Sequence, residues 1–204
     1  DISMSVIRNF PAPVVPEFLP ASEKEAGSLK LVYLARIAPM KNTKYVFEVL
    51  SKVRSNIELH VYGPVEHEEY WAECRRLIEA LPANISVDYK GGVAASNVIS
   101  ILKKYHAYIL PTRGENFGHT IFEAASSGLP LIISDATPWK NLQEKEIGFD
   151  IPLADSEKFV QAIEWMAGLT LTQLNSMKKK AHDFAESYIF ENDDVIAAER
   201  CFFR

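Results

Sequence analysis

The sequence predicts an α/β protein built on a doubly wound parallel sheet. Strands in the middle of such a sheet are typically continuous apolar runs, and the chain has three of them, at residues 29–35, 107–110 and 131–133. Residues 57–61 and 85–89 instead alternate apolar with polar side chains, as strands nearer an edge do. We therefore expect the strand order 3-2-1-4-5, and residues 149–151 are a candidate sixth strand.

Apolar side chains at helical spacing predict the helices that connect these strands. The three stripes are Val46, Val49, Leu50 and Val53, then Trp71, Cys74, Ile78 and Leu81, then Val98, Ile101, Leu102 and Tyr105. Thr43 is available as the N-cap of the first of these helices. This alternation of strand and helix is typical of an α/β protein and shows no internal repeat.

Further helices are expected after the last strand. Asp155 or Ser156 caps the first of them, and a second helix carries the apolar stripe of residues 171–184. The Lys178–Lys180 run on that second helix is interpreted as a solvated face. Residues 191–203 are predicted to form a final helix.

Composition favours one soluble globular domain. The chain has 204 residues, 48% of them hydrophobic and 24% charged, which is enough for a well-filled core. A formal net charge of −5 argues against a nonspecific binder of nucleic acid or of anionic membranes, because both use a basic field. Cys74 and Cys201 provide neither a disulfide framework nor, with the five histidines, a zinc-site spacing. A reducing cytosol is the expected compartment.

A strand-loop-helix-strand unit at residues 113–135 carries the main candidate site. Glu115 lies in the loop and Glu123 in the helix, with seven residues between them. Gly118 allows close approach of the backbone, and the N–H groups of His119, Thr120 and Ile121 are expected to be free at a helix N-terminus, where a phosphate binds well. Since His119, Thr120 and Glu123 share one helix face, a phosphorylated sugar or a nucleotide fits the unit.

A second candidate lies just beyond the first central strand. Arg36 and Lys41 are two cations placed there, beside the next helix, so they could clamp a diphosphate from the side opposite Gly118. No G-x-G-x-x-G follows that strand, so the fingerprint of a nicotinamide or flavin dinucleotide site is missing.

These segments resemble the carboxyl-terminal half of retaining glycosyltransferases of the GT-B fold, in the group called family 4 or glycosyl transferases group 1. The two glutamates, a helix of small residues and a Gly-x-Pro strand start match the signature of that family, here with Gly128 and Pro130. The loop from Arg36 to Lys41 resembles the family's G-R-x-x-x-x-K-G diphosphate motif, with Ala35 and Asn42 in place of its glycines. Residues 5–10 resemble the V-I-P-N segment through which the family's chain enters its second domain, with Arg8 where Pro is usual.

The resemblance implies roles for these residues. Arg36, Lys41 and Glu115 are the expected catalytic residues, with the two cations stabilising the leaving diphosphate and Glu115 beside the donor sugar. The expected donor-binding residues are Glu123 at the ribose hydroxyls, Gly92 or Val93 at the base, and the helix start formed by Gly118, His119 and Thr120. No metal and no other cofactor is expected, since the nucleoside diphosphate sugar is itself the substrate.

The resemblance also implies a domain plan. Residues 1–28 are expected to be an interdomain connector and residues 29–204 the donor-binding domain, with an amino-terminal acceptor domain absent. The isolated chain is then expected to be inactive as a transferase. We expect the whole protein to work in biosynthesis of cell-surface polysaccharide, in the cytoplasm or at the inner membrane face as a peripheral protein, with any membrane contact made by the missing domain.

Three questions stay open at this point. A half of a sugar-nucleotide epimerase and a non-catalytic nucleotide-sugar-binding module are alternatives to a transferase. Trp139 and Lys140 either face the donor sugar or the missing domain, or merely pack and reach to solvent. The sequence specifies neither the sugar nor the base nor the acceptor.

Overall fold

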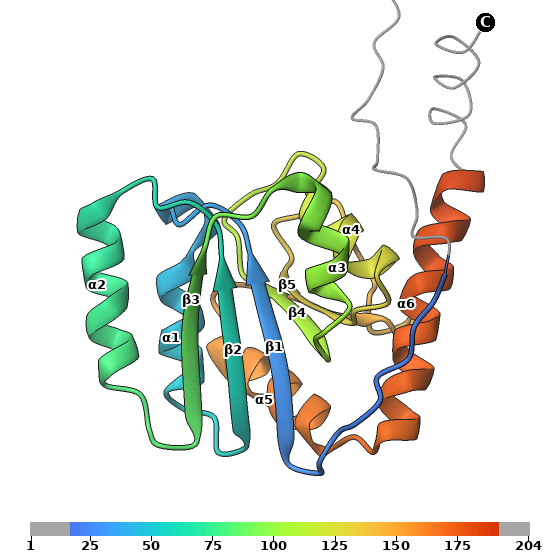
Figure 1. Ribbon diagram of the computed structural model, residues 1–204, viewed down its shortest axis with the longest axis horizontal. Helices are drawn as coiled ribbons and strands as arrows, with labels where there is room; N and C mark the ends of the chain where they lie inside the picture. The colour runs from blue at the N-terminus through green and yellow to red at the C-terminus, as the bar shows by residue number, and fades with distance from the viewer. Residues whose placement is uncertain (1–16, 192–204) are drawn as a thin grey trace, which may run out of the picture.

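The computed structural model describes residues 17–191 (Figure 1). Six parallel strands within this range form one sheet. Along the chain the strands are β1 (Ser28–Leu34), β2 (Asn56–Tyr62), β3 (Ile85–Gly91), β4 (Ala107–Leu110), β5 (Leu131–Ser134) and β6 (Gly148–Ile151). Their spatial order is β3-β2-β1-β4-β5-β6. The predicted α/β fold and strand order are confirmed, and the candidate sixth strand is present.

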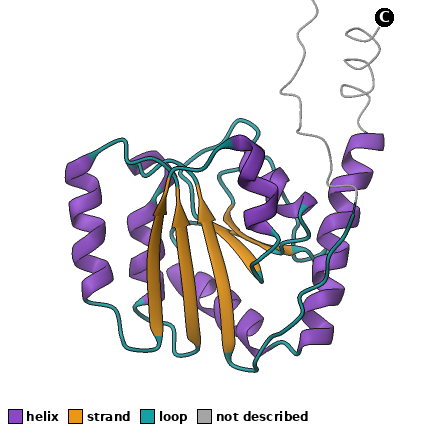
Figure 2. Cartoon of the chain, in the orientation of Figure 1, coloured by secondary structure: helices purple, strands orange, loops and turns teal. Residues whose placement is uncertain are grey.

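Helices cover both faces of the sheet, which is thus the middle of three layers (Figure 2). On one face α1 (Thr43–Leu50) packs between α2 (Glu68–Glu79) and α5 (Ser156–Gly168). On the other face α4 (His119–Ser126) packs between α3 (Val98–Leu102) and α6 (Leu171–Glu191). Two short 3-10 turns, η1 (Pro39–Lys41) and η2 (Ala95–Asn97), lie in the connections.

Burial along the strands follows the sequence pattern. Every residue of β4 and of β5 is buried, whereas Ile85 is the only buried residue of β3. Continuous apolar runs therefore mark the middle of the sheet and alternation marks its edge, because the edge strand β3 keeps polar side chains toward solvent.

The predicted N-cap of α1 is wrong. Asn42 precedes the helix with left-handed dihedral angles of φ 58° and ψ 38°, and Thr43 is the first helical residue. The Thr43 hydroxyl instead lies 2.8 Å from the hydroxyl of buried Tyr33, a partner from β1 that local sequence could not reveal. The third helix is also shorter than its apolar stripe, since α3 ends at Leu102 and a turn at Lys103 and Lys104 separates it from Tyr105.

Lys178 contradicts the expectation of a solvated lysine run. Its side chain is fully buried, and Nζ donates a hydrogen bond to the carbonyl oxygen of Tyr105 at 2.8 Å. Burial lowers the pKa of this ammonium to about 8. Lys179 and Lys180 are exposed, as predicted, and pair with Asp183 and Glu146.

Residues 17–27 run along α6 before entering the sheet (Figure 1). The Asn175 side chain makes two hydrogen bonds to Ala21, accepting from its N–H at 2.8 Å and donating to its carbonyl at 3.1 Å. Lys24 Nζ donates to the carbonyl of Ala167 at 2.7 Å. The resemblance at residues 5–10, the thiol of Cys201 and all but the first residue of the expected 191–203 helix lie outside the described part of the chain. None of the helices within residues 17–191 is long and apolar enough to cross a membrane.

The N-cap of α5 offers a first testable prediction. Asp155 accepts a hydrogen bond from the backbone N–H of Lys158 at 3.2 Å, which confirms one of the two expected caps. Asp155→Ala should lower the unfolding temperature by a few degrees, because a first-turn N–H loses its acceptor. Asp155→Ser keeps a cap oxygen and should lose less in the same melting experiment. Equal losses in the two variants would show that the cap does not stabilise the fold.

Candidate active site at the β1–β4 switch point

The predicted site residues gather where β1 and β4 end, at the edge marked by the strand arrowheads in Figure 1. The strand order reverses between these two strands, so the chain leaves β1 toward α1 on one face and leaves β4 toward α4 on the other. Ligands of open α/β sheets bind in the crevice that such a switch point opens. Arg36 and Lys41 follow β1, and the segment from Glu115 to Thr120 follows β4.

Lys41 and Glu115 form an ion pair at this switch point, between the loop after β1 and the loop after β4. Lys41 Nζ lies 2.6 Å from Glu115 Oε1, and the two side chains are only 15% and 12% exposed. Water and salt screen a pair so little exposed much less than a surface pair. Lys41 is one of the two cations expected at the diphosphate, and Glu115 is the carboxylate expected at the sugar. The two side chains are thus in direct contact, although 74 positions separate them in the sequence.

Backbone hydrogen bonds hold the surrounding loops together. The carbonyl of Met40 accepts from Arg113 N at 2.8 Å and from the Thr112 hydroxyl at 3.2 Å. Glu115 N donates to the carbonyl of Ala136 at 3.1 Å, which ties the loop after β4 to the loop after β5. The ion pair is therefore carried by backbone segments that are fixed against each other. Sequence analysis missed these contacts, since backbone groups carry no signature in the sequence.

Gly118 is the N-cap of α4 and has left-handed dihedral angles of φ 82° and ψ 62°. The positive φ favours glycine here, and a Cβ would in addition lie 2.8 Å from Ile121 Cδ1, so that side chain would have to shift. The N–H groups of His119 and Thr120 have no acceptor within residues 17–191 and are available to a ligand. The N–H of Ile121 is not free, contrary to prediction, because it donates to the Gly118 carbonyl at 2.9 Å.

Two buried tyrosines support the crevice from below. The Tyr108 hydroxyl lies 2.9 Å from Thr120 Oγ1 and donates to the Leu34 carbonyl at 3.1 Å, so it joins the start of α4 to the end of β1. Thr120 thus offers a ligand its N–H, while its hydroxyl hydrogen is used on Tyr108. Tyr33 similarly holds the loop after β1, with its hydroxyl 3.4 Å from the Lys41 carbonyl. Burial raises the pKa of both phenols, which keeps both hydroxyls protonated.

Glu123 is a half-buried carboxylate on the same face of α4 as His119. It has neither a hydrogen bond nor an ion pair within the described residues, and burial raises its pKa. A half-buried carboxylate without a partner is costly to the isolated protein. It is therefore well suited to accept hydrogen bonds from the hydroxyl groups of a ligand.

Arg36 is oriented differently from Lys41. Its side chain is 58% exposed, and the guanidinium pairs with Glu66 in the loop after β2, a partner that sequence analysis did not identify. The two non-glycine positions of this motif are explained by local geometry. Asn42 adopts the left-handed conformation that glycine would, which asparagine tolerates better than most residues. Ala35 lies in a bend directly after β1, and its N–H donates to the Tyr62 carbonyl at 3.1 Å.

Gly92 and Val93 lie in the connection that runs from β3 to α3 past the tips of β2 and β1 (Figure 1). Gly92 is exposed and Val93 is half-buried against the core. No hydrogen bond or ion pair in the described chain joins them to the Lys41–Glu115 pair. Their expected contact with the base stays a prediction.

Trp139 packs rather than facing a ligand. Its ring is 5% exposed, and its indole N–H donates to the carbonyl of Phe117 at 2.5 Å, so it braces the loop ahead of Gly118. Lys140 is exposed and donates to the carbonyl of Asp135.

Other candidate sites lie away from this crevice. His182, Asp183 and Glu186 on α6 offer side-chain ligand atoms within 4.8 Å of one another. His182 Nδ1 already contacts the carbonyl of Ser126 at 2.7 Å, and Asp183 pairs with Lys179, so this cluster is explained without a metal. Two hollows open at β6 and at the amino-terminal ends of β1 and β2, and neither is lined by an expected donor-site residue.

The family model for glycosyl transferases group 1 matches residues 15–184. The chain belongs to this family. The GtfA subunit of the UDP-N-acetylglucosamine–peptide N-acetylglucosaminyltransferase of Limosilactobacillus reuteri subsp. suis is 25% identical over 173 residues, which cover 79% of this chain and 32% of that protein. The phosphatidyl-myo-inositol mannosyltransferase of Mycobacterium leprae is 25% identical over 130 residues, 61% of this chain and 33% of that protein. The chain thus spans about a third of the length of the curated relatives that it matches.

Solved structures share the fold. The pneumococcal O-GlcNAc transferase GtfA, crystallised with UDP and GlcNAc, superposes with a TM-score of 0.64 at 20% identity over 94% of this chain and 38% of that chain. The resemblance read from the sequence motifs is thereby confirmed at the level of family and fold.

Proposed function

We propose that this chain is the nucleotide-sugar-binding half of a retaining glycosyltransferase, with residues 29–204 as the donor-binding domain. The arrangement at the β1–β4 switch point carries the proposal. There the Lys41–Glu115 pair follows β1 and β4, the two available N–H groups begin α4, and Glu123, which has no partner within residues 17–191, lies one turn further along that helix. This combination offers positive charge for a diphosphate and carboxylates for sugar hydroxyls.

Negative charge grows on the leaving diphosphate as the sugar–oxygen bond breaks. Lys41, Arg36 and the N–H groups of His119 and Thr120 stabilise that charge, which is electrostatic catalysis and requires no acid residue. Lys41 then divides its contacts between Glu115 and the diphosphate, so the pair places the carboxylate beside the sugar. Because these groups already supply the positive charge, we expect no metal cofactor.

Two relatives favour a uridine nucleotide. The Limosilactobacillus reuteri protein is named for UDP-N-acetylglucosamine, and the pneumococcal transferase was solved with UDP and GlcNAc. We therefore propose a UDP-sugar as the donor, with Glu123 at the ribose hydroxyls and Gly92 or Val93 at the base.

The acceptor site belongs to a domain outside this chain. Transfer requires the acceptor to be held against the sugar in a closed, water-excluding cleft. One half of a GT-B protein supplies neither an acceptor site nor a closed cleft. The chain alone should therefore bind the donor without transferring its sugar. We place the whole protein in cell-surface glycan biosynthesis, in the cytoplasm or at the inner membrane face.

Calorimetric titration of the chain with UDP, GDP, ADP and NAD tests the proposal. We expect saturable binding of UDP, because the crevice offers a diphosphate site, and no binding of NAD, because the dinucleotide fingerprint is missing. The proposal is contradicted if UDP, GDP and ADP all give no heat of binding at millimolar concentration. It is also contradicted if NAD is the one ligand that binds. A sugar-nucleotide epimerase half would also bind UDP, and it differs in converting the sugar once the missing domain is present.

A further inference from the structure

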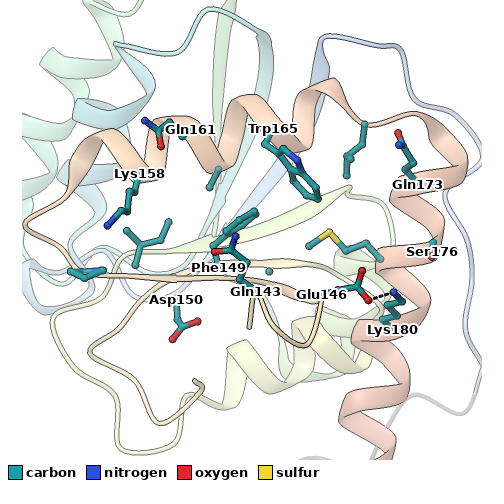
Figure 3. A pocket seen from close by; sticks show the side chains of 16 residues that line it. Gln143, Glu146, Phe149, Asp150, Lys158, Gln161, Trp165, Gln173, Ser176 and Lys180 are labelled. Carbon is teal, nitrogen blue, oxygen red and sulfur yellow. Dashed lines mark hydrogen bonds and ion pairs between the residues drawn. The ribbon is translucent and has the colours of Figure 1, made fainter. Parts of the chain in front are cut away.

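A groove of about 830 Å³ crosses the edge of the sheet at β6, between α5 and α6 (Figure 3). None of the residues assigned to the donor site lines it. Its volume falls within the range of ligand pockets, roughly 300–1,000 Å³, and is large enough for a short oligomer rather than a single small ion. The groove is therefore a separate candidate site.

Trp165 forms an aromatic surface inside this groove. Its side chain is 52% exposed, and its ring stands edge-on to Phe149 with centroids 5.5 Å apart and an interplanar angle of 80°. Figure 3 shows the two rings side by side between the helices. The other two tryptophans of the chain, Trp71 and Trp139, are each 5% exposed. A large ring that is half open to solvent and packed edge-on against a second ring offers a ligand an apolar surface inside the groove.

Side-chain amides surround the ring. Gln161 lies one helical turn before Trp165 on α5, and Gln143 and Gln173 line the same groove. The amides of Gln143 and Gln161 have no hydrogen-bond partner within residues 17–191. Gln173 uses its oxygen for Thr170 N, at 2.9 Å, which leaves its NH₂ group available. Because an amide both donates and accepts, this set matches groups that do the same, such as hydroxyls.

The charges of the groove are balanced. Its lining contains two carboxylates, Glu146 and Asp150, and two ammonium groups, Lys158 and Lys180. Glu146 pairs with Lys180 and Lys158 pairs with Asp155, while Asp150 accepts the N–H of Leu142 at 2.9 Å. A phosphate, a nucleic acid or a polycation would need one sign of charge in excess. The groove therefore suits an uncharged ligand.

We propose that this groove binds a neutral oligosaccharide, at a site separate from the donor crevice. A pyranose ring has an apolar face of C–H groups, which packs on Trp165, and a rim of hydroxyls, which exchange hydrogen bonds with Gln161 and its neighbours. No bond is made or broken there. The site holds a glycan chain beside the domain, and it requires no nucleotide.

The fluorescence of Trp165 provides the test. The intact chain is titrated with maltotetraose, cellotetraose, chitotetraose and mannotetraose. At least one of them should shift the tryptophan emission to shorter wavelength and saturate at millimolar concentration, because Trp165 is the one largely exposed indole. Gln161→Ala should weaken that binding several-fold, and Trp165→Ala, followed by calorimetry, should weaken it about ten-fold or more.

Leu19→Ala is the matched control, since it removes another exposed apolar side chain, 43% exposed, outside the groove. It should bind the tetrasaccharides as the parent does, and all three variants should bind UDP equally, which separates this proposal from that of the donor site. The proposal is overturned if no tetrasaccharide binds or if Trp165→Ala binds with unchanged affinity. A concentration-dependent dimer that Trp165→Ala dissociates would assign the groove to a second copy instead.

Discussion

Replacing Lys41 with alanine is expected to weaken UDP binding by about ten- to a hundred-fold. Lys41 is 15% exposed and is held over the crevice by its 2.6 Å contact with Glu115, so it can offer a diphosphate a charge-assisted hydrogen bond with little competition from water. Calorimetric titration of the variant with UDP measures the loss. Lys41→Arg keeps the charge and should retain most of the affinity.

Arg36→Ala should cost less than Lys41→Ala. Arg36 is 58% exposed and pairs with Glu66, so solvent screens its charge and it must be redirected to reach a ligand. Lys104→Ala is the charge-matched control, because Lys104 is an exposed lysine beyond α3 that leaves the site loops untouched. If Lys41→Ala lost no more affinity than Lys104→Ala, the diphosphate would have to bind elsewhere. A melting curve shows whether Glu115, left without its partner, destabilises the variant.

The fold was predictable because burial in a parallel sheet leaves a strong mark on the sequence. Continuous runs such as residues 107–110 occur where both faces of a strand are covered, and alternation over residues 85–89 occurs where they are not. Helix boundaries were less predictable, since they depend on tertiary partners. The Thr43 hydroxyl, for example, bonds to Tyr33 instead of capping α1.

Lys178 shows how residue type can conceal a correct pattern. Leu174, Lys178, Ala181 and Ala185 are all buried, and their spacing is that of one helix face. Position alone would have placed Lys178 in the core. Lysine is rarely buried, however, and two further lysines follow it, so residue type predicts a solvated run.

The place of the candidate site residues in the fold was predictable where the sequence itself carries their chemistry. Glu115, Glu123 and Lys41 stand at motif positions, and the fold brings their elements to one edge of the sheet. The supports were not predictable, because Tyr33 and Tyr108 look like ordinary apolar strand residues until their hydroxyls find partners across the sheet. The contact between Lys41 and Glu115 likewise depends on the pairing of β1 with β4.

Glu123→Ala is expected to weaken binding of UDP itself by about ten-fold or more. The carboxylate is half-buried and has no partner within residues 17–191, so it is free to accept hydrogen bonds from the ribose hydroxyls. Burial raises its pKa, and only the ionised form is a full acceptor, so UDP affinity should fall as the pH is lowered through that raised pKa. Glu123→Gln should remove this pH dependence. A variant that kept the parent's affinity and pH profile would show that Glu123 does not touch the nucleotide.

Glu115→Ala should leave UDP affinity nearly intact and lower the affinity for UDP-N-acetylglucosamine. Glu115 lies on the loop ahead of Gly118, and our proposal places it at the sugar rather than at the nucleoside. Its loss also frees the Lys41 ammonium for the diphosphate. Turnover by the protein that includes the acceptor domain should fall as well, because contacts to the reacting sugar act in the transition state. The measurement is a pair of titrations, UDP against UDP-N-acetylglucosamine, on Glu115→Ala and on Glu123→Ala. In Glu123→Ala the affinities for both ligands should fall about equally, because both ligands contain the ribose. If both affinities also fell equally in Glu115→Ala, Glu115 would contact the nucleotide and its role at the sugar would be refuted.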